Sequence, residues 1–324
     1  MARMQQDSPG RAWASPGSVA EPAAPARDAA TGRAQAAVPG RAPAPPPVPH
    51  VALRPMTVAD VLDGGFSVIK ARPRRILTLT AAFVVPVQIL AAWLQRDVAG
   101  GLGLTEVFGD DPTVLREASG SSTGGGELLG LIALLLVPSL ALVCLAAAIG
   151  HLVSGWSVGH DASGRELVRL VASRWWPLLA TFVVVHAAEV AGVFSCYIGS
   201  FAVMALFVVV APIVGVENPT VGETLGRSVR LVRGRFWPVL GTAVLMGVVS
   251  SLLGNTLSAL PQGVAALIGF DAAWPLVALG GILGQLVTAP FVAAATTLLY
   301  FDLRVRTEGL DIEFGARRAI NRAG

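Results

Sequence analysis

The feature that most constrains this chain is an arginine-bearing helical segment that leads directly into a long apolar one. In the stretch TVGETLGRSVRLVRGRFWPVL, which runs from Thr220 to Leu240, Thr220 and Glu223 have the spacing of a capping box. Apolar residues then recur at helical spacing on one face, and arginines gather on the other. The apolar face comprises Val221, Leu225, Val229, Val232 and Phe236, and the arginines are Arg227, Arg230, Arg233 and Arg235. With Trp237 at the entry to the apolar segment, this pattern predicts an amphipathic helix in a membrane interface.

Two weaker versions of the pattern occur upstream. The stretch from Thr57 to Leu77 aligns with the first one without a gap, and Thr57 and Asp60 take the capping positions. Its predicted apolar stripe is Val58, Val61 or Leu62, Phe66 and Ile69, followed by Lys70, Arg72, Arg74 and Arg75. The other version starts at Ser163 with Glu166 three residues on; it has Leu167, Leu170, Val171 and Trp175 on one side and Arg165 and Arg169 on the other. A basic helix beside any membrane span has this pattern, but three versions in phase with the spans favour an internal threefold repeat.

Composition and apolar segments indicate a membrane protein. Hydrophobic residues make up 53% of the chain and charged residues 14%, against roughly 25% charged residues in soluble domains. Six segments are long and apolar enough to span a membrane, at 76–94, 128–153, 176–194, 198–216, 236–257 and 274–299. The sequence therefore predicts an all-α membrane protein with six transmembrane helices, arranged as three repeats of a cytoplasmic amphipathic helix plus a transmembrane hairpin. Prolines in the even-numbered spans, Pro138, Pro212 and Pro290, either mark kinks that open a cavity or simply recur with the repeat.

The regions that flank the spans divide the chain and orient it. Residues 1–52 are rich in Ala, Pro and Arg and are predicted to be a disordered cytoplasmic tail, 53–303 form the transmembrane domain, and 304–324 form a basic cytoplasmic tail. The first residues lack the apolar core of a signal peptide, so the first span is expected to direct insertion. Arginines lie before the odd-numbered spans and after the last, whereas the opposite loops have almost none. Both termini are therefore expected in the cytoplasm, in a bacterial plasma membrane.

Polar residues within the spans are the first candidates for function. His186 and Glu189 are three residues apart in the third span and share a helix face. They are either a proton relay or polar ligand site, or a mutually satisfied pair near the interface, or Glu189 snorkels outward to the interface. Gln88, Asn255 and Gln285 are the other polar span residues, and their ordinary role is hydrogen bonding between helices. The predicted intramembrane polar site comprises His186, Glu189, Gln88 and Gln285.

Arginines of the three amphipathic segments are the second set of candidates. Near a membrane surface each basic residue attracts anionic head groups by about 1 kcal/mol. Their alternative role is only to set the topology. The predicted lipid contacts, in the cytoplasmic leaflet, are Arg72, Arg74, Arg75, Arg165, Arg169, Arg227, Arg230, Arg233 and Arg235.

Catalytic and cofactor signals are absent from the sequence. It contains no phosphate-binding loop, no HExxH, no paired CxxC and no GxSxG with triad partners. Cys144 and Cys196 are expected at different depths, where they form neither a disulfide nor a metal site. We therefore expect no cofactor and no enzymatic activity, and the net charge of +3 does not indicate nucleic-acid binding.

Three segments resemble a known family. RPMTVADVLDGGFSVIKARPRRIL (Arg54 to Leu77), ETLGRSVRLVRGRFWPVLG (Glu223 to Gly241) and LLYFDLRVRTEGLD (Leu298 to Asp311) are similar to actinobacterial integral membrane proteins with the membrane domain named after glycerophosphoryl diester phosphodiesterase. The resemblance covers roughly residues 52 to 312. It implies a six-span protein of undefined role. The catalytic barrel that some members carry, with its His-Arg pair and Glu-x-Asp metal ligands, has no counterpart here.

Three functional hypotheses follow. The first is a membrane module that contacts anionic lipids or partner proteins through its cytoplasmic helices. The alternative is a small permease subunit with a site between the repeats. A phosphodiesterase rests only on the family name, so hydrolysis is not expected.

Overall fold

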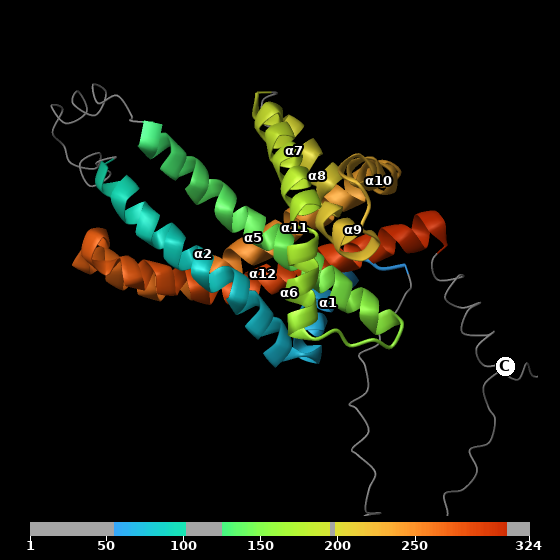
Figure 1. The fold of residues 1–324 in the computed structure, drawn as a ribbon, viewed down its shortest axis with the longest axis horizontal. Coiled ribbons are helices and arrows are strands. Elements are labelled where there is room, and N and C mark those ends of the chain that lie inside the picture. The colour runs from blue at the N-terminus through green and yellow to red at the C-terminus, as the bar shows by residue number, and fades with distance from the viewer. Residues whose placement is uncertain (1–54, 102–124, 195–197, 310–324) are drawn as a thin grey trace, which may run out of the picture. The chain divides into compact units, whose positions relative to one another are not determined.

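The computed structural model describes residues 55–101, 125–194 and 198–309. The chain divides into two units, 1–46 and 47–324, and every described residue belongs to the second. The predicted N-terminal tail, most of the segment between the first two predicted spans (residues 102–124) and residues 310–324 lie outside the described ranges. Within those ranges the secondary structure is helical, without strands, and the helices are α1 (Val58–Ala71), α2 (Pro73–Gly101), α5 (Gly125–Ser157), α6 (Gly164–Ser173), α7 (Trp175–Val193), α8 (Ile198–Phe207), α9 (Val210–Glu217), α10 (Val221–Arg233), α11 (Phe236–Ile268) and α12 (Phe270–Glu308) (Figure 1).

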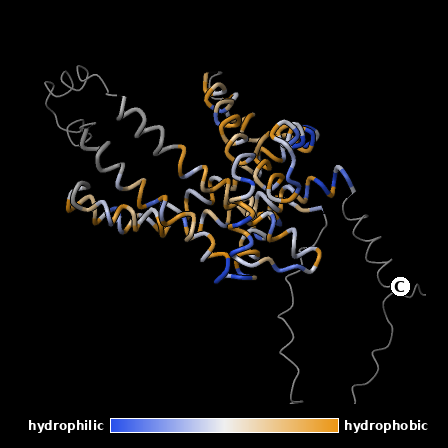
Figure 2. The backbone as a smooth tube through the Cα atoms, viewed as in Figure 1, coloured by the Kyte–Doolittle hydropathy of each residue, from blue (hydrophilic) through white to orange (hydrophobic). Residues whose placement is uncertain are grey.

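Six stretches of the described helices are long and apolar enough to cross a membrane, which indicates a multi-pass membrane protein. They are Pro73–Trp93, Leu136–Ser157, Trp175–Val193, Ile198–Glu217, Phe236–Ile268 and Ala273–Glu308. Figure 2 shows hydrophilic residues gathered at α10, at the C-terminal end of α12 and near the start of α2, while the long helices are mostly apolar. The predicted helical class and six spans are confirmed at this level.

Capping boxes begin the three short helices that precede spans. In α1, α6 and α10 the N-cap side chain accepts a hydrogen bond from the N3 backbone, and the N3 carboxylate accepts one from the N-cap backbone. The residue pairs are the predicted ones, Thr57/Asp60, Ser163/Glu166 and Thr220/Glu223. The hydrogen bonds from Thr220 lower the pKa of Glu223, and those from His160 and Ser163 lower the pKa of Glu166. The sequence therefore predicted correctly where these helices begin.

Replacing Thr220 with alanine should lower the free energy of unfolding by about 1 kcal/mol, because one backbone donor of α10 loses its acceptor. Carboxylates with pKa values lowered on folding stabilise the folded protein above their unfolded pKa, and this contribution disappears as the pH falls through the folded value. The T220A penalty should therefore shrink at acidic pH. Thermal unfolding of the detergent-solubilised protein at neutral and acidic pH measures both effects, and an equal penalty at the two values would contradict the coupling to Glu223.

The buried faces of α1 and α10 differ from the predicted stripes by about one residue. Gly65, Thr224 and Ser228 are buried beside larger apolar residues, and of the predicted stripes Val61 and Val232 are buried as expected. The buried sets are Val61, Gly65 and Val68 in α1, and Thr224, Ser228, Leu231 and Val232 in α10. The reason is close packing: a Cβ on Gly65 would lie 3.2 Å from Phe291, and the Ser228 hydroxyl donates to the Leu206 carbonyl at 2.6 Å.

The predicted apolar stripe of α6 agrees better with its buried face. Leu167 and Val171 are buried as expected, but Trp175 is exposed. Trp175 begins the next helix, α7, so it does not continue the stripe of α6.

Several helix boundaries also differ from the predicted spans; for example, α2 continues to Gly101, past the predicted end at 94. The fourth span is two helices, α8 and α9, separated at Val208 and Val209, because the ring and missing N–H of Pro212 disrupt the preceding turn. The segment between the predicted spans 236–257 and 274–299, which was expected to be a connection and contains Pro261, is instead mostly helical, since α11 continues to Ile268 and is capped by Gly269, where φ is +102°. Similarly α12 extends past the predicted boundary at 303/304 to Gly309, which has φ +65°.

The core forms around the C-terminal half of α12, which contacts α1, α2, α5 and α11. Phe291, Leu303 and the alanines between 293 and 295 are fully buried there, and Phe66 of α1 stacks on Phe291 with ring centroids 4.4 Å apart. On the other side of α5, Gly215 of α9 lies directly against the Ala147 backbone. These contacts bring the capped helices and the ends of α5, α9 and α12 together.

Candidate functional site

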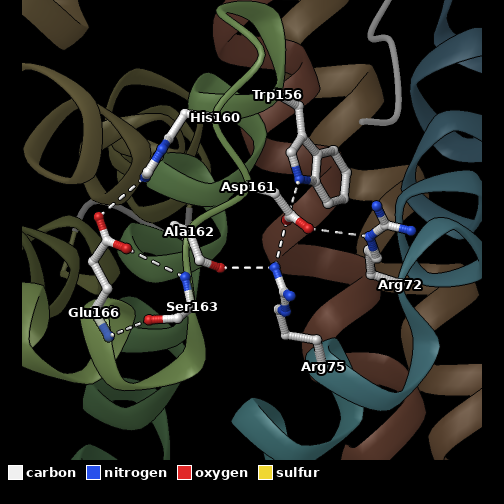
Figure 3. A network of polar contacts seen from close by, with 8 residues as sticks. All are labelled: Arg72, Arg75, Trp156, His160, Asp161, Ala162, Ser163 and Glu166. Atoms are coloured by element: carbon white, nitrogen blue, oxygen red, sulfur yellow. Dashed lines mark hydrogen bonds and ion pairs between the residues drawn. The ribbon is translucent and has the colours of Figure 1, made fainter. Parts of the chain in front are cut away.

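Asp161 is the centre of one polar network at the capped end of the helices. It follows α5, and its carboxylate accepts hydrogen bonds from Arg72 Nε at 3.3 Å, Arg75 Nη1 at 2.5 Å and Trp156 Nε1 at 3.1 Å (Figure 3). Arg75 also donates to the Ala162 carbonyl at 2.9 Å. The network ties the start of α2 to the segment before α6, so Arg72 and Arg75 are engaged within the protein.

Replacing Asp161 with asparagine should destabilise the protein by about 2 kcal/mol, because two half-buried guanidinium groups lose their counter-charge. Asp63 provides the matched control: it is exposed on α1 and has no partner among the described residues, so D63N should change stability by less than about 0.5 kcal/mol. Denaturant unfolding of both variants in the same detergent measures the difference. Equal effects would show that the Asp161 network does not hold the two segments together.

A second network joins α9, α10 and α12. Arg227 pairs with Glu217 and, at 2.9 Å, with Glu308. Arg304 bonds Glu308 at 2.8 Å, and the hydroxyl of the buried Tyr300 donates to Glu217 at 2.5 Å. Burial lowers the pKa of Arg227, but the hydrogen bonds and charges of Glu217 and Glu308 outweigh it and raise the pKa overall. Arg227 was predicted to face lipid head groups; the structure instead places it in this internal network.

Two further contacts bind segments distant in sequence. Asp302 accepts a hydrogen bond from the Met56 backbone at 2.6 Å and pairs with Arg306, which in turn donates to the Met56 carbonyl at 2.8 Å. Arg174 donates to the carbonyls of Val214 and Gly215 at the end of α9, and burial lowers its pKa. All three capped helices are thus held at the same end of the helical bundle as the C-terminus of α12.

Five of the predicted lipid-contact arginines are exposed and have no partner among the described residues. They are Arg74, Arg165, Arg169, Arg230 and Arg233. Exposed tryptophans lie at the starts of the adjacent spans: Trp176 of α7 is 70% exposed and Trp237 of α11 is 76% exposed. Exposed guanidinium groups beside exposed indoles are the combination that a membrane interface accommodates.

Arg235, the remaining predicted lipid contact, lines a cavity of about 300 Å³ between α1, α11 and α12. It is half-buried and has no ion-pair partner among the described residues. Thr57 and Arg306 contribute polar groups to the lining, and Val239 and Leu299 contribute apolar ones. The cavity also has Asp302, the ion-pair partner of Arg306, in its lining, so it combines charges of both signs with an apolar wall at the arginine-bearing end.

His186 and Glu189 lie on α7, as predicted, but apart from the other two members of the predicted intramembrane site. His186 Nδ1 is 3.0 Å from the Phe182 carbonyl, and its Nε2 is 3.8 Å from the Glu189 carboxylate. The imidazole thus has a hydrogen-bond partner on its own helix. Neither residue lines the cavity in which Gln88 and Gln285 meet.

Gln88 and Gln285 are brought together in a polar cavity of about 240 Å³ between α2, α11 and α12. They also line a small adjoining void of about 10 Å³ on the α5 side. The larger cavity adds polar side chains that the predicted site did not include: Ser250, Ser251, Asn255, Ser258, Gln262 and Thr288. Asn255 was noted in the sequence only as a polar span residue.

A sequence signal for this cavity existed in the spacing. Ser251, Asn255, Ser258 and Gln262 recur at three- and four-residue intervals, so they share one face of α11. Opposite them, Gly280, Gly281 and Gly284 precede Gln285 and Thr288 on α12. A polar face within a transmembrane helix predicts a helix contact or a cavity. The predicted site did not include this face of α11, because the polar span residues were considered one at a time.

The remaining chemistry and the comparisons with known proteins add no assignment. Among the described residues no three His, Cys, Asp or Glu side chains are grouped to hold a metal ion. Cys144 is buried in α5, and Cys196 lies outside the described ranges. The chain matches no family model, no curated protein and no solved structure.

Proposed function

We propose that this protein is a membrane-embedded module that binds anionic lipid head groups through the basic surface formed by Arg74, Arg165, Arg169, Arg230 and Arg233. The observation that carries the proposal is that these arginines are exposed and unpaired within the described residues, beside exposed Trp176 and Trp237. Arginines that serve only the fold are paired, as Arg72, Arg75 and Arg227 are. The unpaired ones are therefore available to head groups.

The finer architecture is part of the proposal. Three units, each a capped basic helix followed by a transmembrane hairpin, make up the chain, and their arginine-bearing ends face the cytoplasm of a bacterial cell. The three capping boxes and the ion pairs that link the capped ends support this arrangement. Because anionic lipids give the cytoplasmic leaflet a negative surface potential, the same orientation favours head-group binding.

A relationship to the family named in the sequence analysis is also part of the proposal. A relationship to the membrane domain named after glycerophosphoryl diester phosphodiesterase accounts for the three quoted segments. It assigns no catalytic residue to this chain, so phosphodiester hydrolysis is not part of the proposed function. Protein partners at the basic surface would compete with lipids for the same arginines.

Changing Arg230 and Arg233 to glutamine should reduce the preference for phosphatidylglycerol over phosphatidylcholine roughly 30-fold, at about 1 kcal/mol for each arginine. The preference is measured by native mass spectrometry of the purified protein with equimolar lipids. A variant with lysine at both positions keeps the charge and should retain most of the preference. The R165Q/R169Q variant tests the second helix in the same way. An unchanged lipid preference in both glutamine variants would remove the basis of the proposal.

A small permease is the second candidate, and the polar cavity between α2, α11 and α12 is the observation that favours it. The predicted alternative placed this site between the repeats and included His186 and Glu189, which do not line the cavity. Solute flux into proteoliposomes tests transport directly. Flux that is lost in Q285L would support the permease, whereas absence of flux across a broad panel would leave the lipid-binding module.

A further inference from the structure

The polar cavity contains amide groups that the protein itself does not satisfy. Neither Gln88 nor Gln285 has a hydrogen-bond partner among the described residues, although both lie within membrane-spanning helices. The Oε1 atom of Gln88 lies so close to Gly281 that a Cβ there would come within 2.7 Å of it. Both side chains are half-buried and line the open cavity, so whatever fills the cavity supplies their hydrogen bonds.

The size of the cavity exceeds what a single bridging water fills. A single water needs about 10–15 Å³ of such space, against about 240 Å³ here. Gly284 and Gly254 keep α11 and α12 in close contact beside it, since a Cβ on Gly284 would lie 3.0 Å from the Gly254 carbonyl oxygen. Ser251 and Asn255 are exposed, so the cavity opens on the α11 side. The space is large enough for a small organic molecule.

The position of the cavity along the helices determines from which side it is reached. Ser251 and Gln262 lie 15 and 26 residues after Phe236, roughly 22 and 39 Å along α11 at 1.5 Å per residue. A hydrocarbon core about 30 Å thick that begins near Trp237 would end between them. Along α11 the cavity therefore extends from the third of the hydrocarbon layer farthest from the capped helices to the membrane surface on that side.

The lining specifies the chemistry of the occupant. It consists of amides, hydroxyls and glycines, and none of the described residues that line it is charged or aromatic. A charged ligand would be buried without a counter-ion, which is costly. Amide and hydroxyl groups each donate and accept, as hydroxyl groups of a ligand do. We propose that this cavity is a binding site for a small uncharged polyol, which enters from the side opposite the arginine-bearing surface. The proposal concerns binding alone and rests neither on transport nor on lipid binding by the arginines.

Equilibrium dialysis of the full chain in phosphatidylcholine nanodiscs tests the site, with radiolabelled erythritol, myo-inositol and glucose as probes in glycerol-free buffer. The Gln88→Leu and Gln285→Leu variants keep the side-chain size and remove the amide. Each should weaken binding roughly ten-fold, as the loss of a neutral hydrogen bond implies. Their melting temperatures without ligand should stay the same or rise, because an unpaired amide is gone. Thr256→Val is the matched control: Thr256 is on α11, bonds only to the Leu252 carbonyl at 2.7 Å and does not line the cavity.

A parallel set of nanodiscs that contain a monoglucosyl diacylglycerol distinguishes a free polyol from a lipid head group with the same chemistry. Saturable binding of either, weakened in both glutamine variants and unchanged in T256V, supports the proposal. Absence of saturable binding in both arms would show a cavity that holds water only and would overturn it. A wild-type dimer that Q88L and Q285L dissociate would also overturn it, because a second copy of the chain would then cover the polar face of α11.

Discussion

Replacing Gly215 with alanine should destabilise the protein by about 3 kcal/mol, the upper part of the range for overpacked cores. A Cβ at this position would lie against the Ala147 carbonyl oxygen and within 2.8 Å of the Ala147 Cα. The obstacle is backbone within a helix, which cannot rotate away as a side chain does. The helices α5 and α9 would have to separate, and fully buried Ala147, Ile213 and Val214 would lose contacts. Unfolding of detergent-solubilised protein by heat or by added SDS measures the loss.

Gly241 on α11 is the matched control for this substitution. Nothing lies within 4 Å of a Cβ placed there. Alanine is the better helix former by about 1 kcal/mol, so G241A should leave stability unchanged or raise it. If G215A proved as stable as G241A, α5 and α9 would not be packed as closely as the structure has them.

Replacing Arg227 with methionine should have an effect of similar size, about 3 kcal/mol, because Glu217 and Glu308 would remain half-buried with only Arg304 to balance them. The raised pKa of Arg227 means that its guanidinium keeps its charge throughout the usual pH range. The loss in R227M therefore measures two stranded carboxylates and not a change in protonation of the wild type. Denaturant unfolding of R227M against wild type is the measurement.

Two controls separate this network from a general loss of charge. Arg230 is on the same helix but is exposed and unpaired within the described residues, so R230M should change stability by less than about 0.5 kcal/mol. The double variant R227M/E217Q leaves one carboxylate, Glu308, paired with Arg304 at 2.8 Å, and should recover much of the loss. An R227M/E217Q protein no more stable than R227M would mean that the ion pairs are not the cause.

Some features of the fold could be read from local patterns. The capping boxes at Thr57, Ser163 and Thr220 were predictable because a helix start depends on residues three apart in the chain. The six spans were predictable because length and apolarity alone decide whether a helix can cross a membrane. Their ends were less predictable: Pro261 looks like a loop signal, yet α11 continues through it. Neighbouring helices decide whether an internal proline is tolerated.

The candidate sites show the same division. Gln88 and Gln285 were identified one by one as polar span residues, but only the packing of α2 against α11 and α12 makes them walls of one cavity. His186 and Glu189 have equally distinctive side chains and line no part of it. Arg227 and Arg230 are three residues apart on one helix and cannot be told apart by sequence, although one is paired internally and the other is exposed.

By itself, then, the sequence determined the properties that depend on neighbours along the chain: helical class, number of spans, the starts of the three capped helices and the position of the arginines before the spans. The tertiary structure alone decided which face of each short helix is buried, which arginines form ion pairs within the protein and which polar residues line the same cavity. The physical reason is close packing. Gly65 and Ser228 are buried because their small side chains let Phe291 and the Leu206 carbonyl approach closely, and not because they are hydrophobic.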